Sequence, residues 1–294
     1  IMNKRKGLAI ALTALLAMLW GCAKESGPKE DNSGYVYVPE YLEMDIECNY
    51  INSVTSQGDY VFLNAVSWDE ESGESANFLY KYDMMEKKGQ VLALELDQNS
   101  NIGSMAAGAG DSILMIVNSY SYEEDENGEA TNYSSKVELW TVSSEDGAVK
   151  DKKEISQIFE DPENSYVQYF SVDGQGNIYL GGGDNEIHVV DQNMNKVCDI
   201  SADTWIHGMP ASKEGDVYVS LYGEKGMELR KVELSAKKLG EPVQGLSGGY
   251  GNLEFITGST RSFLVDSGSQ VSVVDLSTGE EEELFKWIDA DINS

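Results

Sequence analysis

From Tyr35 onward, apolar and polar residues alternate in many short runs bounded by Gly, Asp, Asn and Ser. An alternation with a period of two predicts β-strands, because successive side chains of a strand point to opposite faces of its sheet. No segment of this part has a helical period. The chain contains 29 glycines and 5 prolines, a balance that suits many tight turns between strands. The body of the protein is therefore predicted to be all-β.

One unit of four strands recurs along this body. Five times an apolar run enters a turn and continues as a second strand, at residues 54–63, 106–115, 172–181, 211–220 and 256–265. Four of these turns place Gly before Asp or Asn, which supply the positive φ angles that tight hairpins need. Third strands are expected at 79–83, 140–141, 186–191, 229–233 and 271–275, and fourth strands at 90–94, 148–155, 196–200, 240–243 and 281–287.

This repeat predicts a β-propeller of four-stranded blades. A single blade has two apolar faces, and stacking blades around an axis buries both of them. The propeller is expected over residues 35–294, with blades at about 50–98, 99–157, 165–203, 204–246 and 250–294. A pair of β-sandwiches is the alternative fold. Residues 287–294 look like the entry to another unit, so we expect the sequence to be a truncated part of a longer chain.

Residues 1–21 are predicted to be a bacterial lipoprotein signal peptide. A basic segment at 4–6 precedes an apolar stretch at 8–19, which is shorter than the roughly 20 residues that span a bilayer. The segment Leu19-Trp20-Gly21-Cys22 resembles a lipobox, with Trp20 where a small residue is usual. The resemblance implies that Cys22 is diacylated and anchors the protein on the extracellular face of the cytoplasmic membrane. Residues 22–34 would form a flexible tether, and an uncleaved signal anchor is the alternative.

The formal net charge of −30 limits the partners of the chain. Such a charge repels nucleic-acid backbones and anionic lipid headgroups, so neither is an expected partner. Solubility at a cell surface accounts for the acidity, and a calcium-loaded surface or a cationic ligand is the alternative. Of the three cysteines, Cys48 and Cys198 fall in different predicted blades, and they are expected to be two separate buried thiols or, alternatively, a disulfide.

Sequence motifs of catalysis, cofactor binding and metal binding are not found in the chain. It has two histidines, His188 and His207, and neither has a Cys or His partner at zinc-ligand spacing. There is no nucleophile elbow and no phosphate-binding glycine loop. The acidic stretch 122–133 departs from the EF-hand pattern and is interpreted as a solvated hairpin loop. We therefore expect no enzyme, no cofactor and no metal, and a structural role for His188. Because carboxylates are abundant, a glycan-active lyase or hydrolase is the less favoured alternative.

A ligand site is expected where the first strand of each blade reaches the rim of the central channel. Counting back from the turns, these strands become more polar toward one end. Aromatic, amide and imidazole groups there would suit a polar, sugar-like ligand. The alternative is that these residues merely line a water-filled channel. The predicted rim consists of Tyr50, Gln168, Trp205, His207, Tyr250 and Asn252.

The chain shows two resemblances to known families. The turn formed by Asp173 and residues 176–179 (Gly-Asn-Ile-Tyr) resembles that of NHL-type sensor propellers. The lipobox, the tether, the segment 35–41 (YVYVPEY) and the closing segment 284–294 (LFKWIDADINS) resemble the N-terminal propeller region of clostridial lipoproteins. Those lipoproteins carry a C-terminal extracellular solute-binding domain of sugar-type ABC transporters.

The second resemblance implies a cell-surface lipoprotein whose non-catalytic propeller binds a ligand or a partner. The expected setting is the capture of carbohydrate for ABC-type uptake. An ABC permease, or a solute-binding domain that follows the propeller, is then the expected protein partner. A propeller that acts as a protein-interaction scaffold is the alternative function.

Overall fold

The computed structural model of the chain describes residues 29–30, 36–37, 44–68, 75–97, 99–124, 130–212, 215–223, 226–243, 251–255, 261–266 and 270–286. The structure divides into two compact units. One is Leu42–Val243, and the other joins Ile1–Tyr41 to Gln244–Ser294. Within the described ranges, no helix has the length and apolar character needed to cross a membrane.

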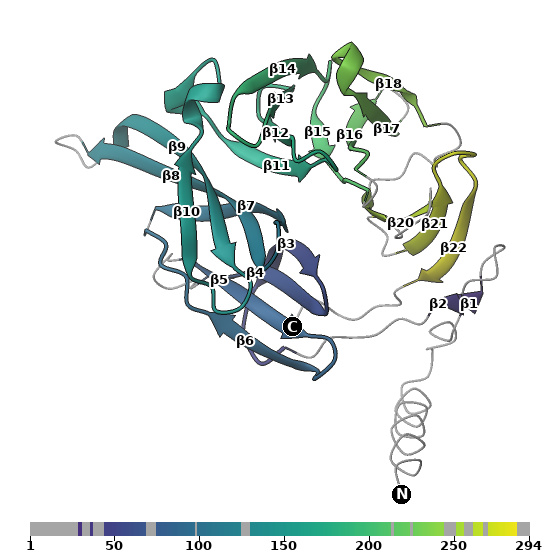
Figure 1. Cartoon of the computed structure of the whole chain (residues 1–294), viewed down its shortest axis with the longest axis horizontal. Helices are drawn as coiled ribbons and strands as arrows, with labels where there is room; N and C mark the ends of the chain where they lie inside the picture. Colours follow the sequence, from purple (N-terminus) through teal and green to yellow (C-terminus); the bar gives the residue numbers. More distant parts are fainter. Residues whose placement is uncertain are drawn as a thin grey trace, which may run out of the picture. The chain divides into compact units, whose positions relative to one another are not determined.

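The unit Leu42–Val243 contains four four-stranded antiparallel blades, in each of which sequence neighbours are paired (Figure 1). The first blade has β3 (Tyr50–Gln57), β4 (Tyr60–Trp68), β5 (Ser75–Asp83) and β6 (Lys88–Leu92). The second has β7 (Ser100–Ala107), β8 (Ser112–Glu124), β9 (Ala130–Ser143) and β10 (Val149–Glu154). The third has β11 (Val167–Val172), β12 (Ile178–Gly182), β13 (Glu186–Val190) and β14 (Lys196–Ser201). The fourth has β15 (Ile206–Gly208), β16 (Tyr218–Gly223), β17 (Gly226–Glu233) and β18 (Lys238–Pro242).

Three short 3-10 helices accompany these blades. The first two, η1 (Ser156–Ile158) and η2 (Pro162–Asn164), connect the second blade to the third, and η3 (Leu234–Ala236) connects β17 to β18.

The other unit contains a fifth blade of the same kind. Its strands are β19 (Gly251–Phe255), β20 (Arg261–Asp266), β21 (Gln270–Asp275) and β22 (Glu281–Lys286), again paired antiparallel in chain order. Two short strands, β1 (Lys29–Glu30) and β2 (Val36–Tyr37), pair with each other in this unit. Across the described residues, the two units contain five four-stranded antiparallel blades, four in one unit and one in the other, and this confirms the predicted all-β propeller fold class.

The turns within the blades explain part of this agreement. In the four predicted Gly-Asp or Gly-Asn turns, the glycine has a positive φ, a conformation that residues with a Cβ rarely adopt. These glycines are Gly58, Gly110, Gly176 and Gly215. The tight reversals are thus encoded locally, so the sequence is sufficient to predict where the first two strands of these blades meet.

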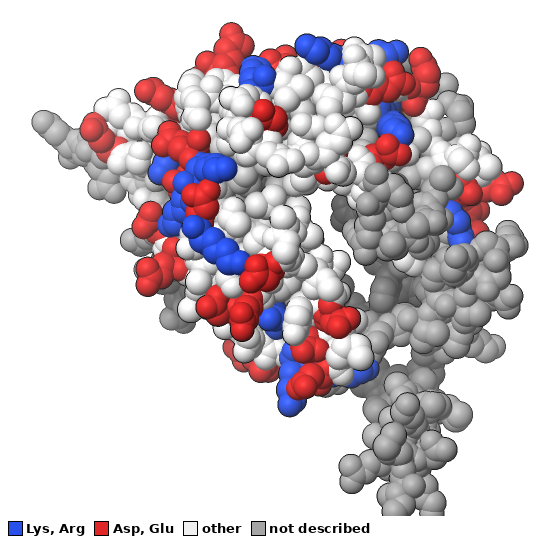
Figure 2. Space-filling view, viewed as in Figure 1, with Lys and Arg blue, Asp and Glu red and all other residues white. Residues whose placement is uncertain are grey.

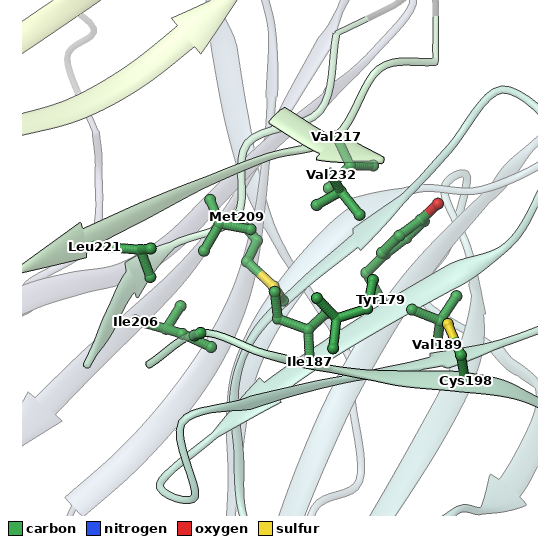
Figure 3. Packing of buried hydrophobic residues seen from close by; sticks show 12 residues of the cluster. Tyr179, Ile187, Val189, Cys198, Ile206, Met209, Val217, Leu221 and Val232 are labelled. Carbon is green, nitrogen blue, oxygen red and sulfur yellow. The ribbon is translucent and has the colours of Figure 1, made fainter. Parts of the chain in front are cut away.

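Hydrophobic cores lie between neighbouring blades. Phe62 and Leu79 of the first blade pack with Ile102, Met115 and Trp140 of the second. Between the second and third blades, residues of β9 and the η1 connection pack against Phe170, Leu180 and Val190. Between the third and fourth blades, Figure 3 shows Tyr179, Ile187, Val189 and Cys198 packed with Met209, Val217, Leu221 and Val232. Each middle blade therefore buries both of its apolar faces, as the repeat predicts.

The inner strands contact one another from blade to blade, β3 against β7 and β7 against β11. Buried asparagines fix two of these junctions. The Asn64 amide of β4 donates to the backbone oxygen of Ile102 at 2.9 Å. The Asn118 amide of β8 donates to the oxygen of Val167 at 2.9 Å, and its own oxygen accepts from the Val167 N–H at 3.1 Å. These hydrogen bonds satisfy the backbone groups of Ile102 and Val167 that point toward a neighbouring blade and not toward a paired strand.

The two described cysteines are both free thiols. Cys198 is buried in the core between the third and fourth blades, where burial raises the pKa of its thiol. Cys48 is half-buried and precedes the first blade. The expectation of two separate thiols is therefore correct for the structure, although Cys48 is not fully buried.

Candidate functional site: a groove between the third and fourth blades

A groove of about 560 Å³ lies between the end of β14, the residues that follow it, and strands β16–β18 of the fourth blade. This volume is in the range of pockets that bind small molecules. The residues with functional groups that line it include Asp203, Thr204, Tyr222, Glu228, Arg230 and Lys237. The groove therefore has polar walls of both charges, with apolar side chains such as Leu221 and Leu239 beside them.

The ion pair between Arg230 and Glu228 dominates the charged wall. The guanidinium donates to Glu228 Oε2 from Nη2 at 2.7 Å and from Nε at 3.1 Å. The two residues occupy alternate positions of β17, so they share one face of the strand. Both side chains are about a third exposed. Since arginine has five N–H donors and this pair uses two, the guanidinium retains donors for a bound molecule.

Tyr222 lines the groove, and the exposed Trp205 directly follows the lining residue Thr204 in the chain. Thr204 donates a hydrogen bond to the backbone oxygen of Tyr222 at 2.9 Å, and the Tyr222 N–H donates to the oxygen of Trp205 at 3.2 Å. The Tyr222 ring lies 5.9 Å from the His207 ring. Trp205 is 74% exposed and Tyr222 is 44% exposed. Burying a large aromatic side chain contributes about 1.5–3 kcal/mol, so an exposed tryptophan beside a groove is typical of a surface that contacts a ligand.

The predicted channel rim is distributed over several blades. Tyr50 begins β3 and is 55% exposed, and Gln168 is an exposed residue of β11. Trp205 and His207 lie at the entry to the fourth blade, where the His207 ring is 5.9 Å from the ring of the groove residue Tyr222. Tyr250 and the side chain of Asn252 lie outside the described part of the chain. Among the described residues, no hydrogen bond or ring contact joins Tyr50, Gln168 and Trp205, and the rim as a whole stays a prediction.

The polar wall of the groove does not stand out in the sequence. Arg230 and Glu228 belong to a third strand, whereas the predicted rim consists of residues at or before first strands. Their Glu-x-Arg spacing is a local signal for two opposite charges on one strand face. The residues that face them across the groove, Asp203 and Thr204, follow the preceding blade. Only the packing of the two blades brings these segments together.

The long hairpin of the second blade departs from the predicted loop. Strand β8 continues to Glu124 and β9 begins at Ala130, so much of the stretch 122–133 is strand. Strand β7 pairs with β8 no further than Ser119, and β10 pairs with β9 from Glu138 onward. Beyond these points, β8 and β9 continue as a two-stranded ribbon. It carries exposed tyrosines, and the rings of Tyr122 and Tyr133 lie 5.9 Å apart.

A polar cluster surrounds His188 in the third blade. The imidazole is 2% exposed, and each of its nitrogens lies 2.8 Å from a carboxylate oxygen, Nε2 from Asp184 and Nδ1 from Asp199. Lys196 forms a 2.7 Å ion pair with the other oxygen of Asp199. Burial acts to raise the pKa of Asp199, but the hydrogen bonds from Lys196 and His188 outweigh it and lower the pKa. Among the described residues, the group that could hold a metal ion is Asp184, Glu186 and His188.

Charges of both signs are interspersed on the surface. Figure 2 shows Lys and Arg side chains among the more numerous Asp and Glu side chains on the face in view, without a large basic area. This distribution fits the acidic composition of the chain.

The fold and the groove define the class of this protein as a β-propeller with a polar inter-blade cleft. No protein-family model and no curated protein matches the sequence. Among solved structures, it is similar to a protein of unknown function from Bacteroides caccae, at 11% identity and a TM-score of 0.55, over 86% of this chain and 87% of that one. Virginiamycin B lyase from Staphylococcus aureus is also similar, at 11% identity and a TM-score of 0.48, over 82% of this chain and 71% of that one. At such low identities the similarity concerns the fold alone.

Proposed function

We propose that this protein is a non-catalytic, ligand-binding propeller that takes a polar, carbohydrate-like solute in the groove between its third and fourth blades. The observation that carries the proposal is the combination of the Arg230–Glu228 pair with the exposed Tyr222 in one groove, next to the exposed Trp205 that follows the lining residue Thr204 in the chain. Sugar rings present C–H groups on their faces and hydroxyl groups at their edges. An aromatic ring packs against the face, while a guanidinium and a carboxylate bond the hydroxyls as donor and acceptor.

The cellular setting of this proposal comes from the sequence. A diacylated Cys22 and the tether at 22–34 would hold the propeller on the extracellular side of the cytoplasmic membrane. The resemblance to lipoproteins with sugar-type solute-binding domains supports a role in carbohydrate capture for ABC-type uptake. Detergent phase partitioning of cells that express the full chain tests the anchor. The wild type is expected in the detergent phase and Cys22→Ser in the aqueous phase.

Calorimetric titration of a panel of soluble oligosaccharides into the full chain tests the ligand proposal. We expect at least one glycan class to bind saturably and to raise the thermal midpoint. Trp205→Ala and Arg230→Gln should each weaken that binding about tenfold or more, which corresponds to about 1.4 kcal/mol. Trp68→Ala is the matched control, because Trp68 is a similarly exposed tryptophan of the first blade.

Two results would contradict the proposal. Binding that is unchanged in both groove variants would place the ligand elsewhere, and a panel with no binder would remove the carbohydrate class. Chromatography of the incubated glycans addresses catalysis separately. Cleavage that the groove variants abolish would show that the protein is a glycan-active enzyme.

A protein-interaction scaffold is the second candidate function, and the β8–β9 ribbon favours it. An isolated two-stranded ribbon is marginally stable in water, and this one exposes Tyr120, Tyr122 and Tyr133. Tyrosine offers a large contact area with few rotatable bonds, which suits a protein-binding surface. If the ribbon binds a partner such as a permease, replacing Tyr122 and Tyr133 by Ser should abolish co-purification with that partner and leave glycan binding intact.

A further inference from the structure

His188, the most buried charged or ionisable side chain of the third blade's polar cluster, is held between two carboxylates. It occupies the third position of β13, directly opposite Asp199 of β14 in the strand register. The ring of Phe159, from the connection between the second and third blades, packs edge-on against the imidazole with centroids 4.8 Å apart. The ring is therefore fixed by β13, by the neighbouring strand and by the inter-blade connection at once.

Glu186 and His188 occupy alternate positions of β13 and so share a face of the strand, and Asp184 lies in the turn before it. One ligand atom from each of the three residues lies within 4.8 Å of the others. A cation at their centre would take Nε2 of His188 and one oxygen from each carboxylate. The Asp184 side chain is 44% exposed, so the site is open to solvent on that side.

Asp199 supplies the outer partner that metal-binding histidines have. A ligating histidine commonly donates its second ring N–H to a carboxylate, which fixes the tautomer and the orientation of the ring. Here Nδ1 lies 2.8 Å from Asp199 Oδ1, and Lys196 fixes the other oxygen of that carboxylate. Nε2 of His188 therefore faces the carboxylates of Asp184 and Glu186, and Nδ1 is already held by Asp199.

The charges of the cluster also favour a cation. Three carboxylates surround one ammonium group and one buried imidazole. The carboxylates outnumber the one ammonium group of the cluster, and a bound divalent cation would offset this excess of negative charge.

We propose that Asp184, Glu186 and His188 bind one divalent transition-metal ion such as Zn²⁺, with Asp199 as the positioning residue. A nitrogen and two carboxylate oxygens suit borderline cations, whereas Ca²⁺ and Mg²⁺ prefer ligand sets made of oxygen alone. Water would complete the coordination on the exposed side. This site is separate from the groove, and the proposal differs from the expectation from the sequence that the chain binds no metal.

Calorimetric titration of ZnCl₂ into the full chain, after removal of metal by EDTA and dialysis, tests the proposal. We expect one Zn²⁺ per chain, a raised thermal midpoint and no competition from a large excess of Ca²⁺. Glu186→Gln and Asp184→Asn should each weaken Zn²⁺ binding at least tenfold, and Asp199→Asn by about 10–100-fold. Asp184 and Glu186 are not fully buried, so these variants are expected to fold, which far-UV circular dichroism checks.

His207→Gln is the matched control, because His207 lies in the fourth blade outside the cluster. It should bind Zn²⁺ as the wild type does, whereas His188→Gln should not bind. Substitution with Co²⁺ gives a second readout, since the visible absorption of the bound ion should disappear in Glu186→Gln. The proposal is overturned if the wild type takes up no Zn²⁺. It is equally overturned if Asp184→Asn and Glu186→Gln bind Zn²⁺ with unchanged affinity, because binding would then be to thiols or scattered carboxylates.

Discussion

Replacing Asp173 by Ala tests how the Asp-x-x-Gly-Asn turn stabilises a blade. One carboxylate oxygen of Asp173 accepts from the backbone N–H groups of Gln175 and Asn177, each at 2.8 Å. The other accepts from the Asn177 side-chain amide at 2.8 Å and from the Tyr179 hydroxyl at 3.0 Å. The single side chain therefore closes the turn between β11 and β12 and also binds a residue of the inter-blade core.

The expected cost follows from these bonds. Losing the bonds to the turn resembles the loss of an aspartate cap, which costs about 0.5–2 kcal/mol. Tyr179 is 2% exposed, so its hydroxyl would lose its acceptor in a buried place, which costs about 1–3 kcal/mol more. We expect Asp173→Ala to lower the free energy of unfolding by roughly 1.5–5 kcal/mol, the sum of these two contributions.

Asp191 provides the matched comparison. It closes the β13–β14 turn in the same way, accepting from the N–H groups of Asn193 and Asn195 at 2.8 Å and from the Asn195 amide at 2.9 Å. Val197 occupies the position that corresponds to Tyr179. Asp191→Ala should therefore destabilise the protein less than Asp173→Ala does.

Urea denaturation followed by far-UV circular dichroism measures these differences. A double-mutant cycle with Tyr179→Phe isolates the bond to the hydroxyl, and we expect a coupling of about 1–2 kcal/mol. Equal losses in Asp173→Ala and Asp191→Ala, together with no coupling in the cycle, would refute the reasoning. The turn would then act through its backbone alone.

Three further predictions concern the blades. Asn118→Ala leaves both backbone groups of Val167 without their buried partner. Urea denaturation should therefore show a loss of about 2–4 kcal/mol in the free energy of unfolding, and a loss below about 1 kcal/mol would contradict this role of Asn118. Gly89→Ala should lower the free energy of unfolding by about 1–3 kcal/mol or more, because a Cβ at this position overlaps the buried ring of Tyr80. An unchanged thermal midpoint would show that the Tyr80 side chain moves aside without cost. Stability should fall as the pH rises above about 10, because burial and the bond to Asp173 raise the pKa of Tyr179 in the folded state, while the unfolded chain loses the proton near the usual value. Tyr179→Phe should reduce this loss of stability at alkaline pH, measured as the denaturation midpoint against pH. A profile identical to that of the wild type would contradict the role of Tyr179.

The candidate site is harder to predict from the sequence than the fold is. Trp205 and His207 belong to the predicted rim because they precede a predicted hairpin, and the His207 ring lies 5.9 Å from the ring of the groove residue Tyr222. The Arg230–Glu228 pair could not, because a charged pair on a third strand is indistinguishable from a solvated face until a neighbouring blade is placed against it. The cluster at His188 is hidden for a related reason. It has no zinc-ligand spacing of Cys and His, and its Asp-x-Glu-x-His pattern requires the strand assignment to become meaningful.

The strands, the turns and the repeat could be predicted from the sequence, because they depend on interactions between near neighbours in the chain. Alternating side chains mark each strand, and Gly58, Gly110, Gly176 and Gly215 mark turns that need a positive φ. Which side chains meet across blades depends on tertiary packing. Asn118 forms hydrogen bonds with Val167, and Asp203 lines the same groove as Arg230. In both pairs, packing of the blades brings together residues that are far apart in the sequence. Such contacts depend on how two apolar faces fit together, and the local pattern of either face carries no information about that fit.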